Sequence, residues 1–120
     1  KGSESAKSMI KALKQNEDLA LLIDQRDSSG LEIDFFGKKA LATDGFANLA
    51  IKYKTMICPV YSIRNQNGTF QIIFEKPMRY EQYKNYNIKE FVETIHKKYF
   101  EKWITRSPAQ WLWVHQRWKL

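Results

Sequence analysis

Apolar residues in the first part of the chain recur at three- and four-residue steps and then give way to a continuous run. Over residues 3–16 the apolar positions are spaced as in an amphipathic helix, and Asn16 is expected to end it. Residues 19–23 form an unbroken apolar run of strand length, which predicts a strand buried on both faces. This strand would place the carboxylate of Asp24 at its C-terminal end.

The middle of the chain begins with a polar, turn-rich stretch. Residues 33–37, which include Phe35 and Phe36, follow it as an aromatic loop of uncertain secondary structure. A second helix is expected over residues 43–53, with Thr43 as its N-cap. Residues 56–63 and 69–74 predict two antiparallel strands, because the Asn67-Gly68 pair between them is a strong hairpin signal.

A long amphipathic helix is expected to begin near Ile88 and to end before Pro108. Its apolar face consists of Phe91, Val92, Ile95, Tyr99 and Trp103. Beyond the proline, Trp111, Val114 and Trp118 recur at helical spacing and predict a short terminal helix. This order of elements predicts an α/β or α+β domain, with helices flanking a mixed sheet and no internal boundary.

Composition limits the classes of partner. The chain has 120 residues, of which 43% are hydrophobic, so one domain can build a core. Its formal charge of +7 favours an anionic membrane surface, a phosphorylated ligand or nucleic acid. No apolar run approaches the ~20 residues that span a bilayer.

Two functions without catalysis compete with an enzyme. One is a basic module that binds nucleic acid or another anionic surface, and the other is an interaction domain whose tryptophan-rich tail docks on a protein. The basic residues favour helical faces and no nucleic-acid motif is present, so nucleic acid is not an expected partner.

Separated motifs in a particular order also carry a resemblance to a known family. They are the apolar run ending in Asp24-Gln25, the Asp34-Phe35-Phe36-Gly37 segment, the Thr43-x-Gly45 helix start, the Ile57-Cys58-Pro59-Val60 strand and the tryptophan-rich ending at residues 110–119. Together they resemble the bacterial lipid A biosynthesis lauroyl/myristoyl acyltransferases, and the similarity extends over nearly all of the chain.

The resemblance implies a reaction and a place for it. Family members move a fatty acyl chain from acyl-carrier protein to a hydroxyl of a lipid A precursor, at the cytoplasmic face of the bacterial inner membrane. Residues 1–120 would be the C-terminal half of a glycerolipid-acyltransferase-like domain, bound peripherally. The membrane anchor and the catalytic histidine motif, a histidine followed five positions later by an acid, would lie upstream. The chain alone is therefore expected to be inactive, and to form a homodimer or a swapped dimer.

The resemblance also indicates site residues at the end of the first predicted strand. Asp24 matches an acid of the family that would hold a basic side chain or position the acceptor sugar, although an aspartate that only forms a turn is the alternative. Gln25 and Arg26 follow at the same edge and are expected to bind a phosphate or the sugar. Arg26 departs from the acidic residue expected there. No cofactor or metal is implied.

Further candidates lie in the aromatic stretch and the tail. Phe35 and Phe36 would line an acyl channel, or else plug the core. Arg117 would bind substrate and, with Arg106 and Lys119, face lipid phosphates beside interfacial tryptophans.

The two histidines of the chain are expected to have structural roles. His96 has Glu101 five positions later, which imitates the spacing of the family motif. It lies within a helical, lysine-rich segment and after the Asp24 strand, so it is interpreted as a solvated helix residue. His115 in the tail is also interpreted as structural.

Overall fold

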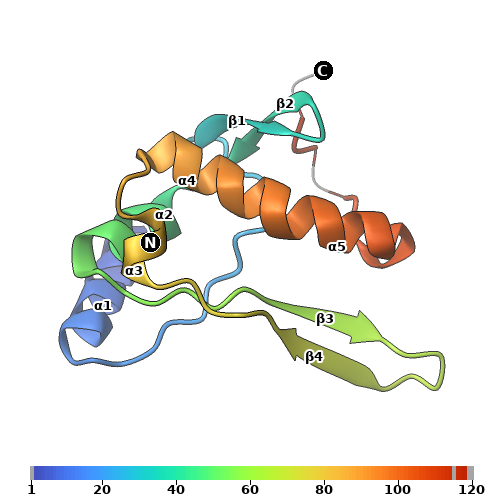
Figure 1. The fold of residues 1–120 in the computed structure, drawn as a ribbon, viewed down its shortest axis with the longest axis horizontal. Helices are drawn as coiled ribbons and strands as arrows, with labels where there is room; N and C mark the ends of the chain where they lie inside the picture. Colours follow the sequence, from blue (N-terminus) through green and yellow to red (C-terminus); the bar gives the residue numbers. More distant parts are fainter. Residues whose placement is uncertain (1, 115, 119–120) are drawn as a thin grey trace.

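One long helix organises the α/β fold, which a computed structural model describes for residues 2–114 and 116–118 (Figure 1). In Figure 1 the hairpin β1–β2 lies along one side of this helix, and the hairpin β3–β4 projects on the other side. The predicted α/β class is confirmed. Within the described residues, however, the strands form two separate two-stranded antiparallel sheets in place of one mixed sheet.

The N-terminal helix α1, Gly2–Lys14, agrees with its prediction and ends where Asn16 takes a left-handed backbone conformation. The predicted strand over residues 19–23 is wrong, because the structure has no strand there. A strand needs a hydrogen-bonded neighbour, and no described strand lies beside this run. The side chain of Leu22 is consequently 86% exposed.

The aromatic stretch belongs to a tight hairpin. Strands β1, Leu31–Phe35, and β2, Lys38–Ala42, pair in antiparallel register through the two-residue turn Phe36-Gly37. Both turn residues have positive φ, 53° and 71°, as in the turn type whose twist matches paired strands. The residues that face inward are Ile33, Phe35, Ala40 and Ala42, all of them buried.

Helix α2, Gly45–Tyr53, packs its buried side chains against the long helix. Its N-cap is Asp44, so the prediction of Thr43 at this position is wrong by one residue. The Thr43 hydroxyl does lie 3.5 Å from the Gly45 nitrogen, as a weak acceptor before the first turn. Lys54, in a left-handed conformation, ends the helix.

The hairpin predicted near Asn67-Gly68 is confirmed. Strand β3, Val60–Arg64, pairs with β4, Phe70–Phe74. Residues 56–59 were expected to belong to the first strand, but they contribute only an isolated bridge between Ile57 and Met78. One face of the hairpin contacts the long helix, where the Tyr61 and Trp103 rings stack 4.5 Å apart.

The long helix comprises α4, Ile88–Ile95, a π-helical turn η1, His96–Phe100, and α5, Glu101–Arg106. A short helix α3, Tyr80–Tyr83, precedes it, and the 3-10 turn η2, Pro108–Gln110, follows it. The predicted apolar face is confirmed for Phe91, Val92, Ile95 and Tyr99, which are buried in the core. Among the residues that the structure describes, every helix is too short or too polar to span a bilayer.

The predicted terminal helix is wrong for the described part of the tail. Residues 111–114 and 116–118 contain no helix, and Trp118 lies beside β2, where it forms an isolated antiparallel bridge with Ala40. Indole hydrogen bonding and ring stacking favour this path: Trp118 Nε1 donates to the Phe35 carbonyl at 3.0 Å, and the Trp118 and Phe35 rings stack 5.3 Å apart. His115 and Lys119 lie outside the described residues.

Candidate functional site

The tail brings the guanidinium of Arg117 into contact with the segment that contains Asp24. The Leu41 nitrogen donates to the Arg117 carbonyl at 2.9 Å, which fixes the main chain of Arg117 against β2. Its Nη1 then donates to the main-chain carbonyl of Asp24 at 3.0 Å. Residues 93 positions apart are thereby joined at one point.

Arg117 is buried, with a side chain only 2% exposed. The expectation that it faces lipid phosphates from the protein surface is therefore wrong, because the extended tail turns its side chain inward. Its guanidinium lies 5.0 Å from the centre of the Phe35 ring, in cation–π contact. Burial lowers the pKa of Arg117, and the negative charge of Asp24 acts in the opposite direction.

The second partner of the guanidinium is His96, which is 0% exposed. The interpretation of His96 as a solvated helix residue is wrong. Arg117 Nη2 lies 2.8 Å from His96 Nε2, and His96 Nδ1 lies 2.8 Å from the Val92 carbonyl. A guanidinium can only donate, so Nε2 accepts and the ring proton is on Nδ1. With Nε2 occupied by Arg117, His96 has no free basic nitrogen to act on a substrate.

Burial lowers the pKa of His96 to about 4, and the charge of Arg117 lowers it as well, whereas the hydrogen bond to Val92 raises it. The unfolded chain therefore takes up a proton at a higher pH, near the ordinary value of 6.5, than the folded chain does. We therefore expect His96 to lower the free energy of unfolding by roughly 3 kcal/mol as the pH falls from about 6.5 to about 4.

Urea unfolding of the wild type and of His96→Gln between pH 4 and pH 7 measures this loss. The glutamine does not titrate but can still accept from Arg117, and all other titrating groups are shared by the two proteins. The wild type should lose more stability than the variant on acidification. Parallel pH profiles would contradict the buried, neutral imidazole.

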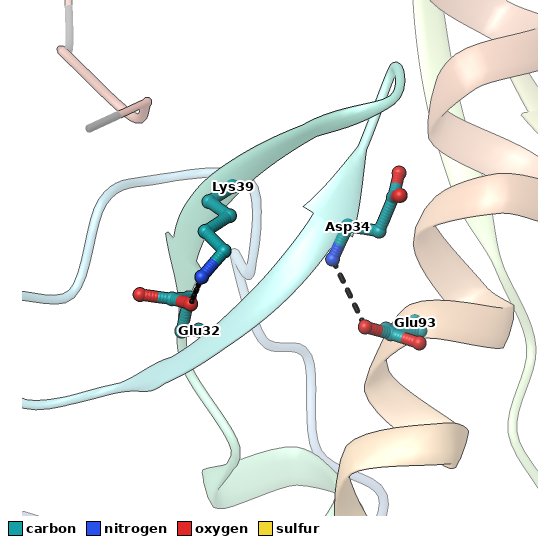
Figure 2. A network of polar contacts seen from close by, with 4 residues as sticks. All are labelled: Glu32, Asp34, Lys39 and Glu93. Carbon is teal, nitrogen blue, oxygen red and sulfur yellow. Dashed lines mark hydrogen bonds and ion pairs between the residues drawn. The ribbon is translucent and has the colours of Figure 1, made fainter. Parts of the chain in front are cut away.

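Two glutamates on the long helix hold the hairpin β1–β2 beside this cluster. Glu93 Oε1 accepts from the Asp34 nitrogen at 2.9 Å (Figure 2), and Glu101 Oε1 accepts from the Phe36 nitrogen at 2.7 Å. Figure 2 also shows Lys39 paired with Glu32 across the two strands, at 3.0 Å. Glu101 therefore binds the hairpin turn, which gives the acid five positions after His96 a structural role.

The remaining residues predicted at the end of the first strand lie next to Asp24. Asp24 is half-buried, whereas Gln25 and Arg26 are exposed. The turn that follows is formed by Asp27, whose Oδ1 accepts from the nitrogen and the hydroxyl of Ser29 at 3.0 and 2.7 Å. These hydrogen bonds lower the pKa of Asp27. Asp27 therefore forms the turn that follows this segment.

The adjacent phenylalanines have different positions. Phe35 is fully buried in the core beneath Arg117, so the core alternative describes it and the expected place in a channel does not. Phe36 is 39% exposed and lines an open pocket of about 570 Å³. The other lining residues are Lys38, Ile104, Thr105, Pro108, Trp113 and Trp118.

Sequence reasoning missed the partners of Arg117. The contact with His96 depends on a tail that is not helical, and helical periodicity carries no information about it. One signal was available: a histidine on the buried side of a strongly apolar helix must satisfy both ring nitrogens. Val92, four residues earlier, is in the position to accept from one of them.

The Asp24 segment, Phe35 of the β1–β2 hairpin and the tryptophan-rich tail, three of the motif segments, meet around the buried Arg117. The sequence pattern of the family described as bacterial lipid A biosynthesis acyltransferases matches residues 1–120, the whole chain. The chain therefore belongs to the bacterial lipid A biosynthesis acyltransferase family. No curated protein matches the sequence.

Proposed function

We propose that this chain forms part of an enzyme that moves a fatty acyl chain from acyl-carrier protein to a hydroxyl of a lipid A precursor. The observation that carries the proposal is the family match over residues 1–120. The fixed position of Asp24, which lies beside exposed polar residues and is held by a buried arginine, supports it. The enzyme would act at the cytoplasmic face of the bacterial inner membrane.

In this proposal Asp24 positions the acceptor sugar or a basic group of the site. Gln25 and Arg26 are exposed at the same edge, where they bind a phosphate or hydroxyl groups of the acceptor. Arg26 suits a phosphate because its planar guanidinium can donate two parallel hydrogen bonds.

The pocket beside Phe36 is the proposed contact for the acyl chain. Its lining is largely aromatic and aliphatic, and its volume of about 570 Å³ is within the usual range for small-ligand sites. Lys38 adds one positive charge to the lining, which suits an anionic group attached to the chain.

The neighbouring tail supplies the proposed contact with an anionic membrane surface. Leu112, Trp113 and Val114 are exposed next to the pocket. Tryptophan favours the membrane–water interface, and Arg106 is exposed at the end of α5, where it can meet lipid phosphates.

The catalytic base of the proposed enzyme is the histidine of the upstream family motif. Residues 1–120 alone are therefore expected to give no acyl transfer, because a positioned base contributes about 10²–10⁴-fold. The assay combines the purified chain with an acyl-carrier protein donor and a lipid A precursor, beside the full-length enzyme as positive control. Turnover by residues 1–120 would contradict the upstream base, and an inactive full-length enzyme would contradict the proposed reaction.

A further inference from the structure

The Arg117 guanidinium connects four segments that are distant in the sequence. From the tail it reaches the Asp24 carbonyl at 3.0 Å, His96 Nε2 at 2.8 Å and the face of the Phe35 ring at 5.0 Å. These partners belong to the segment after α1, the π-helical turn and strand β1. The Asp24 main chain is thus tied to the tail, the long helix and β1 through one side chain.

This arrangement is a costly way to stabilise a fold. The groups that contact the guanidinium are neutral, the negative charge of Asp24 offsets part of the cost of its burial, and its Nε is buried without a hydrogen-bond partner. A buried charge with such partners is a weak source of stability, and an apolar residue of similar volume often serves as well. The guanidinium does, however, define the distance and direction between His96 and Asp24, which an apolar side chain cannot do.

We propose that Arg117 is a positioning residue that fixes Asp24 for acyl transfer, with His96 as the neutral acceptor that orients the guanidinium. The inference rests on the proposed function, in which Asp24 takes part in transfer. Arg117 does not touch the substrate in this account, because it is buried. It acts on the reaction by holding the Asp24 segment in place.

The planar fork of arginine is essential to this role. One Nη atom binds the Asp24 carbonyl while the other binds His96, so the two contacts constrain each other. A lysine keeps the positive charge but has a single nitrogen on a flexible stem, and it cannot reproduce both contacts in this fixed geometry. Arg117→Lys therefore keeps the positive charge at this position and removes the two fixed hydrogen bonds, so it tests the positioning role alone.

The test compares Arg117→Lys, Asp24→Asn and the double variant in the full-length enzyme, with Arg64→Lys as a matched control at an exposed arginine. The measured quantities are kcat and KM for transfer from acyl-carrier protein to a lipid A precursor, with thermal melting beside them. We expect Arg117→Lys to lower kcat about tenfold or more with little change in KM. The double variant should be no slower than Asp24→Asn, because both changes act on one group.

Wild-type kcat in Arg117→Lys, or effects that multiply in the double variant, would overturn the positioning role. Wild-type kcat in Asp24→Asn would instead show that the proposed site is wrong, whatever Arg117 does. Should Arg117→Lys not fold, His96→Leu removes the orienting acceptor and leaves Arg117 in place. We expect His96→Leu alone to lower kcat, and the double variant His96→Leu with Asp24→Asn to be no slower than Asp24→Asn alone. If the two effects multiply in the double variant, the positioning role of Arg117 is wrong.

Discussion

Replacing Asp24 by asparagine in the full-length enzyme is expected to lower the rate of acyl transfer more than about tenfold while the fold stays intact. Asparagine keeps the size of the side chain and removes its charge. The main-chain carbonyl that binds Arg117 remains, so the hydrogen bond to the guanidinium is kept. The effect should therefore appear in kcat and only weakly in thermal melting.

Asp18→Asn is the matched control, since Asp18 is an exposed carboxylate in the same segment. Its transfer rate should equal that of the wild type. If Asp24→Asn has unchanged kinetics and unchanged melting, Asp24 is a structural residue and the proposed site has to be placed elsewhere.

Arg117→Glu is expected to destabilise residues 1–120 by roughly 3–5 kcal/mol. The variant places a carboxylate where the Asp24 carbonyl and the lone pair of His96 Nε2 both require a donor. It also loses the attraction between the guanidinium and the Phe35 ring. Urea unfolding at neutral pH measures the change in the free energy of unfolding.

The same charge reversal at an exposed arginine provides the comparison. Arg79 is exposed at the N-terminus of α3, where the helix dipole tolerates a negative charge, so Arg79→Glu should change stability by no more than about 0.5 kcal/mol. Equal stability of the two variants would mean that Arg117 lies at the surface, as the sequence pattern had suggested.

Elements whose signal is local were predictable from the sequence. The period of 3.6 residues identified α1 and the long helix, and Asn67-Gly68 identified the hairpin β3–β4. The hairpin β1–β2 was missed because its turn begins with Phe36, a residue that rarely takes positive φ. An apolar run such as residues 19–23 becomes a strand only beside another strand. The sequence of the run itself does not indicate whether such a neighbour is present.

The candidate site was predictable only in part, for a related reason. Resemblance indicated Asp24 and Arg117 separately, but not their contact, because they lie 93 positions apart. The spacing of tryptophans in the tail suggested a helix with Arg117 outside. The indole hydrogen bond of Trp118 to Phe35 overrides that periodicity and turns Arg117 toward His96.

The proposed enzyme acylates a lipid A precursor, so its lipid product must differ in mass from the precursor. The most direct measurement incubates the full-length enzyme with an acyl-carrier protein donor and the precursor, and determines the mass of the lipid product. We expect a product heavier by one acyl group, formed only when the acylated carrier is present and strongly reduced by Asp24→Asn. A precursor whose mass stays unchanged with acyl donors of every chain length would show that the proposed reaction is wrong.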